Sequence, residues 1–324
     1  MFNYLKRLFF ITPVKPHIIQ IEITNKCNLD CAMCPRKSFG LAYEHMDFNI
    51  LKQVAKKIPP SSEVILTGWG EPLLHPNIHE VISLFKKKDC FVRLTTNGTL
   101  LSKEMVKKLI NDGLDSISVS IDSFEILDSN DLRHKSSIIK DAKDTIRDFV
   151  AIRADKKEPF IIIQPTLHKG KENELLDLIR EGKRLGVDKI NIVRLDTKFN
   201  KNLKSLTAKE EYRLSKELIA LSDKLKIEVD FLPFISFTGL KRAFFIIFGR
   251  LLFRKNRPCS KLYNYLYITN SGKVTPCCSL PKYEVGDLLL RSLNEIWNSS
   301  NFKKFRKKSN LICKDCNILR LPDR

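Results

Sequence analysis

The chain has 324 residues, of which 43% are hydrophobic, and this composition excludes a disordered or fibrous protein because it can fill a sizeable core. Its 57 Lys and Arg outnumber its 37 Asp and Glu, so the formal net charge is +20. Such a charge favours anionic partners, namely nucleic acid, a membrane surface or a phosphorylated substrate, without choosing among them.

The nine cysteines are an odd number and most of them lie in tight clusters. This pattern argues against a secreted disulfide scaffold and favours metal binding by reduced thiols. The apolar run at the N-terminus is short and is interrupted by Lys6 and Arg7, and no apolar stretch is long enough to span a membrane. We therefore expect a cytoplasmic protein.

Short β-rich runs alternate with helical patterns over the first two-thirds of the chain. Strands are predicted at residues 18–24, 63–67, 91–96, 116–121, 160–164 and 189–195. Helices are predicted at 49–57, from Pro76, from Ser102 to near Gly113, at 138–153, at 172–185 and from Thr207. Six β-then-α units in a row predict a parallel sheet with helices outside it, because each crossover must return the chain to the same end of the sheet.

The pattern changes after Leu232. Thr207 and Ser292 each begin a capping box, and the Ser292 box is expected to open one helix that continues through Phe305. Four segments are predicted: a basic and apolar extension at 1–16, a core at 17–232, a basic Phe-rich linker at 233–257 and a cysteine-rich region at 258–324.

The linker concentrates aromatic and basic residues. Residues 231–253 contain seven of the 20 Phe, and residues 236–261 contain seven Lys or Arg and no acid. A helix at 240–253 would either lie in the interface of an anionic membrane or pack on the core as an ordinary linker.

Three cysteines follow the first predicted strand. Cys27, Cys31 and Cys34 lie within eight residues, a spacing that suits a soft metal. Three thiolates would leave one iron of a four-iron cluster open for a ligand. The alternative is a structural zinc site with a distant fourth ligand.

Three further motifs follow the next strands: Thr-Gly-Trp-Gly-Glu-Pro at 67–72, Thr-Thr-Asn-Gly at 95–98 and Ser-Val-Ser-Ile-Asp at 118–122. With the C-x3-C-x2-C loop they resemble the radical S-adenosylmethionine (SAM) superfamily over about residues 17–196. Met33 departs from the family, which often has an aromatic residue before the third cysteine. The resemblance implies an α/β fold, a partial (β/α)6 TIM-like barrel, and a [4Fe–4S] cluster that is held by the three cysteines and binds SAM.

The carboxyl ends of parallel barrel strands form the site in such folds. Candidate cofactor-binding residues there are Gly68, Gly70, Glu71, Asn97, Ser118, Ser120 and Asp122. The two glycines let the backbone approach a ligand, and the serines and Asp122 share one strand face. Alternatively, Ser118 and Ser120 are small packing residues and Asn97 is a turn residue. No catalytic acid or base can be named.

A second cysteine set lies in the C-terminal region. Cys259, Cys277, Cys313 and Cys316 have spacings that resemble the auxiliary-cluster module called SPASM in its full form and twitch in its short form. A predicted hairpin at 267–276 would bring Cys277 beside Cys259. The resemblance implies a small cysteine-rich iron–sulfur domain with a second, closed [4Fe–4S] cluster. A four-cysteine zinc ribbon is the alternative, and Cys278 could replace Cys277 as a ligand.

The resemblance also implies an activity. It implies that the enzyme reductively cleaves SAM to a 5′-deoxyadenosyl radical, which abstracts hydrogen from a substrate carbon, in an oxidation or in modification of a peptide, sugar or lipid-linked group. A flavodoxin or ferredoxin would be its electron donor. The alternatives are a zinc- or iron–sulfur-bearing interaction protein without catalysis and an RNA-modifying radical enzyme. We expect no nucleic-acid partner because no RNA-binding module is visible.

Overall fold

The computed structural model describes residues 15–124, 142–197, 200, 202–231, 259–313 and 316. The strands are β1 (Ile18–Ile21), β2 (Glu63–Leu66), β3 (Phe91–Thr96), β4 (Ser116–Val119), β5 (Phe160–Ile163), β6 (Thr166–Leu167), β7 (Lys189–Asn191), β8 (Val193–Arg194), β9 (Glu228–Asp230), β10 (Tyr265–Ile268), β11 (Lys273–Thr275) and β12 (Gly286–Asp287). The α-helices are α2 (Phe48–Lys57), α3 (Ile78–Lys86), α4 (Lys103–Asn111), α5 (Ala142–Arg153), α6 (Glu172–Leu185), α7 (Ala208–Leu225), α9 (Leu293–Trp297) and α10 (Ser300–Ile312).

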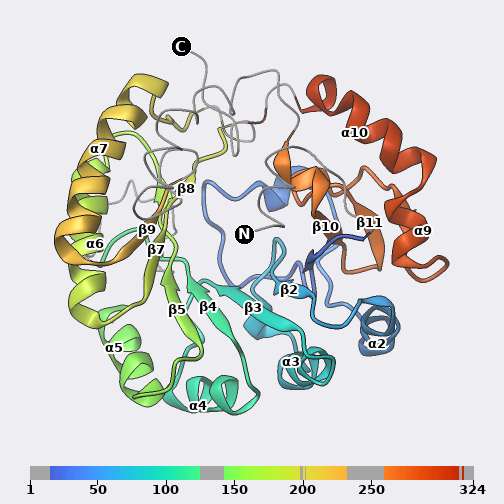
Figure 1. The fold of residues 1–324 in the computed structure, drawn as a ribbon, viewed down its shortest axis with the longest axis horizontal. Helices are drawn as coiled ribbons and strands as arrows, with labels where there is room; N and C mark the ends of the chain where they lie inside the picture. The colour runs from blue at the N-terminus through green and yellow to red at the C-terminus, as the bar shows by residue number, and fades with distance from the viewer. Residues whose placement is uncertain are drawn as a thin grey trace.

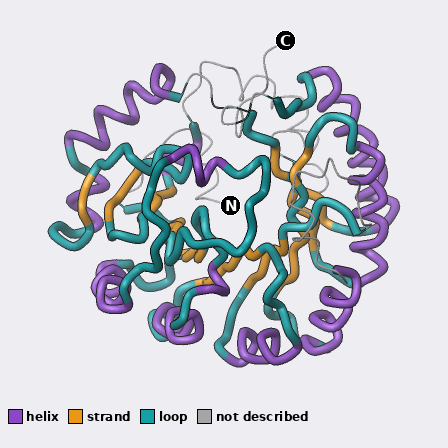
Figure 2. Tube along the Cα trace, turned by 180° about the vertical axis from the view of Figure 1, so that it is seen from behind, coloured by secondary structure: helices purple, strands orange, loops and turns teal. Residues whose placement is uncertain are grey.

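The described strands form a curved, mostly parallel sheet whose outer side is covered by the helices (Figure 1). Its order is β12-β11-β10-β1-β2-β3-β4-β5-β7-β9, and β6 pairs with β8 separately. Figure 2 shows the same arrangement from behind, with the strands inside an arc of helices. The predicted α/β partial barrel is therefore confirmed.

The core lies between the sheet and the helices. Ile19 and Ile21 of β1 and Leu51 and Val54 of α2 are all fully buried in it. Burial of each such side chain contributes about 1.5–3 kcal/mol. Because side chains alternate along a strand, Gln20 of β1 points to the inner side of the barrel.

Local sequence signals placed most helix ends correctly. Ser102 caps α4 by accepting the Met105 N–H, and α6 ends before Gly186, whose φ is 83°. The Thr207 capping box is present. The prediction that Pro76 begins a helix was wrong by two residues, because Asn77 is the N-cap of α3. Residues 138–141 of the fourth predicted helix lie outside the described residues.

Two predicted elements are divided. The run at 189–195 becomes β7 and β8, because Ile192 donates its N–H to Asp230 whereas Val193 donates to Pro165, so the chain changes partners there. The predicted single helix after Ser292 becomes α9 and α10, because Ser299 caps a new helix by accepting the Phe302 N–H.

The C-terminal cysteine region continues the barrel sheet. β10 pairs in parallel with β1, with Ile18 opposite Tyr265 and Ile21 opposite Ile268. The predicted hairpin is present as β10 and β11. The first cysteine set and two members of the second, Cys259 and Cys277, therefore flank neighbouring strands of one sheet.

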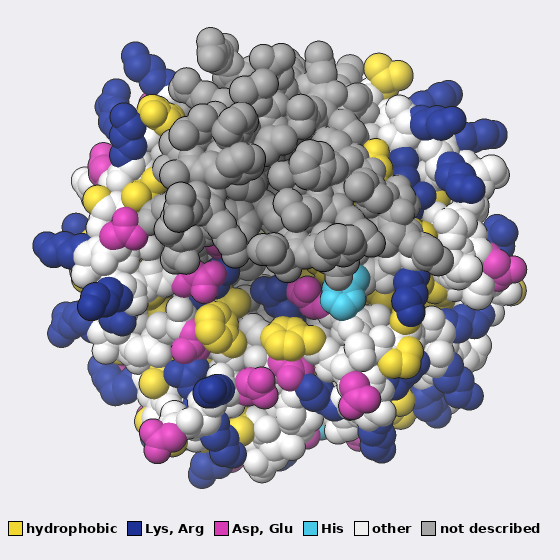
Figure 3. Space-filling model, viewed as in Figure 1, with side chains coloured by type: hydrophobic (Ala, Val, Ile, Leu, Met, Phe, Trp, Pro, Cys, Tyr) yellow, Lys and Arg dark blue, Asp and Glu magenta, His cyan; other side chains and the backbone are white. Residues whose placement is uncertain are grey.

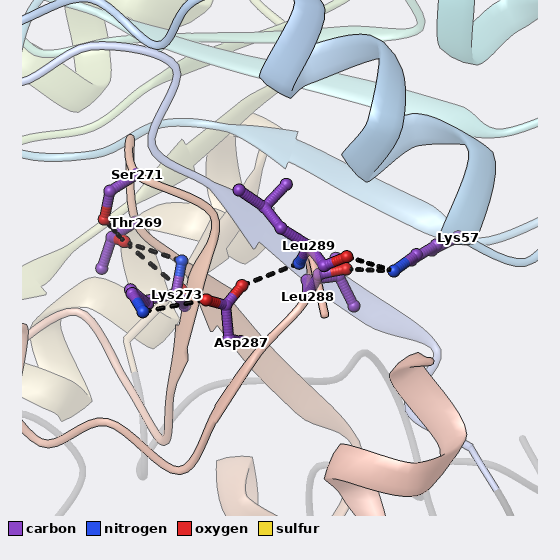
Figure 4. A network of polar contacts seen from close by, with 7 residues as sticks. All are labelled: Lys57, Thr269, Ser271, Lys273, Asp287, Leu288 and Leu289. Carbon is purple, nitrogen blue, oxygen red and sulfur yellow. Dashed lines mark hydrogen bonds and ion pairs between the residues drawn. The ribbon is translucent and has the colours of Figure 1, made fainter. Parts of the chain in front are cut away.

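A lysine on the barrel also holds the C-terminal region. Lys57, at the end of α2, donates from Nζ to the carbonyl oxygens of Leu288 at 2.6 Å, Leu289 at 3.0 Å and Arg291 at 3.2 Å. Asp287 orients the same turn, because it accepts the Leu289 N–H at 2.8 Å and pairs with Lys273 (Figure 4). One ammonium group thus donates hydrogen bonds to three backbone carbonyls of the C-terminal region.

Within the described part of the chain, no helix has the length and apolar character needed to cross a membrane. The predicted extension at 1–16, described only from residue 15, and the predicted linker helix at 240–253 lie outside that part. Both alternatives for the linker helix, membrane binding and packing on the core, stay predictions.

Candidate functional site

The first cysteine loop connects β1 to α2, with the one-turn helix η1 (Pro35–Phe39) directly after Cys34. The sulfur of Cys27 accepts the Leu29 N–H at 3.4 Å and lies 3.9 Å from Nδ2 of Asn97. Burial raises the pKa of the Cys27 thiol, an effect that the Leu29 N–H opposes. The Cys34 N–H donates to the Cys31 carbonyl at 3.0 Å, which closes the loop on itself.

The two glycines after β2 are required by close packing against this loop. A Cβ added at Gly70 would lie 2.4 Å from the carbonyl oxygen of Lys26 and 2.5 Å from that of Thr24. A Cβ added at Gly68 would lie 2.3 Å from Cγ of Glu22. The glycines therefore let the end of β2 rest directly on the start of the cysteine loop, a reason that sequence reasoning had not considered.

Glu71 ties the ends of two strands together beneath the loop. Its side chain is 2% exposed and accepts hydrogen bonds from Thr96 Oγ1 at 2.8 Å, the Asn97 N–H at 2.7 Å and the Leu73 N–H at 3.1 Å. Burial raises its pKa to about 7. Because all three of these donors belong to the protein, Glu71 has a structural role: it holds the turn after β2 to the end of β3.

Asn97 connects the end of β3 to the cysteine loop. Its Nδ2 donates to Asn28 Oδ1 at 2.9 Å, and its Oδ1 accepts the Thr99 N–H at 3.0 Å. Asn28 in turn donates to the Thr99 hydroxyl at 2.8 Å. Asn97 thus occupies a turn and also contacts the cysteine loop, and its role as a cofactor-binding residue stays a prediction.

The residues predicted after β4 lie at the neighbouring strand end. Ser118 is buried on β4, and the Ser120 N–H donates to the Thr96 carbonyl at 2.9 Å. Asp122 accepts the Thr166 N–H at 2.8 Å and so joins this end to β6. The structure gathers the motifs after β1, β2, β3 and β4 at one end of the sheet.

The second cysteine set surrounds the β10–β11 hairpin and the end of α10. Cys259 precedes the one-turn helix η4 (Ser260–Tyr263), and Cys277 and Cys278 follow β11. Burial raises the pKa of the Cys277 thiol, as do the nearby thiols of Cys278 and Cys259. Cys313 is the C-cap of α10, and the Cys316 N–H donates to its carbonyl at 3.1 Å.

Cys278 shares neighbours with Cys277, because both thiols act on Tyr265 and are influenced by Lys261. Burial also raises the pKa of Cys278, with Glu22 the carboxylate beside it. Its thiol lies near Tyr265, whose pKa is raised well above the usual value by burial and by the nearby cysteines. The Cys259 thiol is thus among the groups that act on Cys277, and the Glu22 carboxylate is among those that act on Cys278.

All nine cysteines are free thiols, and Cys90 is buried in the core. In the described ranges, no three His, Cys, Asp or Glu side chains converge on one point that would hold a metal ion. The thiolates of a [4Fe–4S] cluster each bind a different iron, so they do not need to converge on one point.

Trp69 joins the two regions, and sequence reasoning missed this. Its indole N–H donates to the carbonyl of Cys278 at 2.9 Å, and its ring centroid lies 5.2 Å from that of Phe39 after the first cysteine loop. Its backbone N–H donates to Glu22 at 2.9 Å. The sequence feature that could have indicated this role is a bulky residue with a side-chain N–H donor between two glycines.

A second buried connection runs beside it. The Tyr265 hydroxyl on β10 donates to Gln20 Oε1 on β1 at 2.5 Å, and Gln20 Nε2 donates to the Thr67 carbonyl after β2 at 2.7 Å. Side chains inside the barrel therefore link the glycine-rich motif to the strand that carries the second cysteine set.

Comparisons with known proteins agree with this architecture. The family model of the radical SAM superfamily matches residues 21–193, and that of the SPASM iron–sulfur cluster-binding domain matches residues 259–317. The tungsten-containing aldehyde ferredoxin oxidoreductase cofactor-modifying protein of Pyrococcus furiosus is 25% identical over 93% of this chain and 87% of its own length. The AdoMet-dependent heme synthase of Methanosarcina barkeri is 24% identical over 91% of this chain and 86% of its own.

A crystal structure of SuiB from Streptococcus suis shares the fold, with a TM-score of 0.71 and 14% identity over 99% of this chain and 78% of that one. The domains matched here imply two kinds of cofactor: SAM with a [4Fe–4S] cluster, and an auxiliary cluster. The glycine-rich turn resting on a three-cysteine loop, and the second cysteine set on the adjoining strands, are thus the two parts of a radical SAM enzyme with a C-terminal SPASM domain, and the chain belongs to that superfamily.

Proposed function

We propose that this enzyme removes a hydrogen atom from a carbon of its substrate and then completes a two-electron oxidation. The radical SAM and SPASM domains establish the enzyme class, which argues against a non-catalytic interaction protein. The presence of a second cysteine set, next to the strand that pairs with β1, favours an oxidation over a redox-neutral rearrangement.

The cysteines fit the groups that the two domains imply. Cys27, Cys31 and Cys34 would hold the SAM-binding cluster, and Cys259, Cys277, Cys313 and Cys316 the auxiliary cluster. N–H donors such as Leu29 stabilise a thiolate, which is the ligating form of cysteine. Cys277 is proposed rather than Cys278 on the cysteine spacing that resembles the auxiliary-cluster module.

When bound, these groups supply an electron that cleaves SAM to the 5′-deoxyadenosyl radical and an acceptor for the electron that the substrate radical loses. The chain itself orients and encloses the reactants. The turn at Gly68 and Gly70 presents backbone groups beside the cysteine loop, and Glu71 fixes that turn to Asn97. Ser118, Ser120 and Asp122 are proposed to line the substrate side of the same strand ends.

The observation that carries the proposal is the 2.9 Å hydrogen bond from Trp69 to the Cys278 carbonyl. It connects the glycine-rich motif directly to the residue that follows the proposed auxiliary ligand Cys277. That contact supports a single reaction centre in which both cofactors serve one substrate.

The substrate is proposed to be a cofactor precursor or a peptide. The two long relatives are named for modifying a cofactor and for synthesising heme, and both align over most of their own length. A flavodoxin or ferredoxin is proposed as the electron donor.

Hydrogen abstraction can be tested before the substrate is known. Reconstituted enzyme is given SAM, dithionite and a metabolite and peptide extract from cells grown in deuterium oxide. We expect 5′-deoxyadenosine that gains deuterium from the extract, and no 5′-deoxyadenosine from Cys31→Ala. Formation of 5′-deoxyadenosine that never gains deuterium, from extracts of several organisms, would contradict abstraction from a carbon of such substrates.

A further inference from the structure

We propose that the outer face of α10 is a docking surface for an acidic one-electron carrier protein of the flavodoxin or ferredoxin class, which exchanges an electron with the auxiliary side of the enzyme. This inference rests on the proposed function, because an oxidation leaves an electron that must depart from the auxiliary site.

The two faces of α10 differ sharply. Phe302, Phe305, Arg306 and Ser309 are buried and hold the helix in place. The Arg306 guanidinium donates to the carbonyls of Leu262 at 3.1 Å and Trp297 at 3.0 Å. The helix is therefore fixed at a defined orientation and its other face is left to solvent.

The solvent face carries four exposed lysines: Lys303, Lys304, Lys307 and Lys308. None of them pairs with an acid among the residues that the structure describes. Leu311 continues the same face one turn later, since it lies four residues after Lys307, and it is 75% exposed. In Figure 3, Lys and Arg side chains gather at the upper right, where Figure 1 places α10.

Little negative charge lies nearby to neutralise this face. Residues 282–313, which include Tyr283 beside the helix, contain seven Lys or Arg and three acids, a net of +4. Of the three acids, Asp287 pairs with Lys273. The Glu295 carboxylate is engaged in its capping box, where it accepts the Ser292 N–H at 2.7 Å. A positive field of this kind speeds and orients the approach of an acidic protein.

The position of the face identifies the kind of partner. α10 ends at Cys313, so at a rise of 1.5 Å per residue the lysines lie within about 15 Å of that cysteine along the helix axis. Tyr283, which is 39% exposed and packs on Phe305 with ring centroids 4.8 Å apart, adds an aromatic contact beside them. A small charged surface with a few apolar groups suits a weak, transient electron-transfer complex.

The transfer itself balances simply. One electron leaves the auxiliary site and one electron enters the oxidised carrier, and no bond is formed or broken. A nucleic acid or an anionic membrane would also be attracted by the lysines, but neither explains why they border the cysteines.

The test compares two full-length variants with equal charge changes. The face variant carries Lys303→Gln, Lys304→Gln, Lys307→Gln and Lys308→Gln. The control carries Lys87→Gln, Lys107→Gln, Lys108→Gln and Lys209→Gln, which are exposed lysines on or beside other helices. Affinity for oxidised flavodoxin is measured anaerobically at low and high salt.

We expect the face variant to bind flavodoxin about tenfold or more weakly at low salt, with a smaller salt dependence, and the control to stay within about twofold of the parent. In a Cys27→Ala, Cys31→Ala, Cys34→Ala background, reoxidation of the reduced protein by flavodoxin should slow by a similar factor. Unchanged binding in the face variant, or loss of binding to tRNA or phosphatidylglycerol vesicles but not to flavodoxin, would overturn the proposal. Deuterium transfer into 5′-deoxyadenosine by the parent tests the proposed function separately, and dithionite-driven SAM cleavage in the face variant should equal that of the parent.

Discussion

Glu71 and Asn97 are joined by a hydrogen bond of 2.7 Å between the buried carboxylate and the backbone N–H, and this bond holds the ends of β2 and β3 together under the cysteine loop. One carboxylate therefore fixes the position of the glycine-rich motif at 67–72 relative to the motif at 95–98. It also has a consequence for stability, because burial raises the pKa of Glu71 from 4.5 to about 7.

The apo-protein should lose stability as the pH rises, through Glu71. Below pH 4.5 the side chain is protonated in both states. Between pH 4.5 and 7 it ionises in the unfolded chain but not in the folded one, so the folded state binds more protons and stability falls with rising pH. Comparison with Glu71→Gln isolates this group, and the free energy of unfolding of the parent relative to the variant should fall by about 2 kcal/mol from pH 5 to pH 7. Denaturant titrations at several pH values measure it, and a rise over that interval would contradict the raised pKa.

Gly70→Ala should destabilise the protein by about 3 kcal/mol or more, because the new Cβ would meet two backbone carbonyls that cannot move alone. Gly170→Ala is the matched control. A Cβ at Gly170 would meet nothing within 4 Å, so only its positive φ of 88° costs stability, about 1 kcal/mol. Equal losses in thermal unfolding of the two variants would show that the contact at the cysteine loop is not tight.

Lys57→Met should loosen the attachment of the C-terminal region. Loss of the ammonium leaves the carbonyls of Leu288, Leu289 and Arg291 without their donor, at a cost of about 1.5–3 kcal/mol. Lys56→Met, at an exposed neighbour, should have little effect. Hydrogen exchange should speed up at residues 286–291 in the first variant alone, and equal exchange in both would remove Lys57 from this role.

Trp69→Phe tests whether the two cofactor regions influence each other. The substitution keeps a ring against Phe39 but removes the N–H that reaches Cys278. One such hydrogen bond is worth about 1 kcal/mol, or about fivefold in affinity. We expect the Cys259→Ala, Cys313→Ala change to weaken SAM binding by up to that factor in the parent, and to have no effect in Trp69→Phe. SAM affinity is measured by calorimetry. If the cysteine changes weaken SAM binding equally with Trp69 and with Phe at position 69, the Trp69–Cys278 hydrogen bond does not couple the two regions.

Much of the fold followed from local signals in the sequence. The alternation of short apolar runs with amphipathic helices predicted the parallel sheet, and capping residues such as Ser102 and Thr207 marked helix starts correctly. The division at Ile192 could not be predicted, because it depends on which distant strand offers the next acceptor.

The candidate site was predicted unevenly, for a related reason. Motif spacing identified the two cysteine sets and placed the other candidates at strand ends. Contacts across more than 200 positions, such as Trp69 with Cys278 and Gln20 with Tyr265, leave no periodic trace in the chain. The burial of Glu71 was likewise invisible in the motif, where it stands as a polar residue after a glycine.

The central claim is that the chain carries two iron–sulfur clusters, one in each cysteine set. The most direct measurement is the iron, sulfide and zinc content of anaerobically reconstituted protein, with Mössbauer spectra, for the parent and for the Cys27→Ala, Cys31→Ala, Cys34→Ala variant. The account predicts about eight iron and eight sulfide in the parent, about four of each in the variant, and no stoichiometric zinc. About four iron with one tightly bound zinc in the parent would contradict it, because the C-terminal cysteines would then form a zinc site.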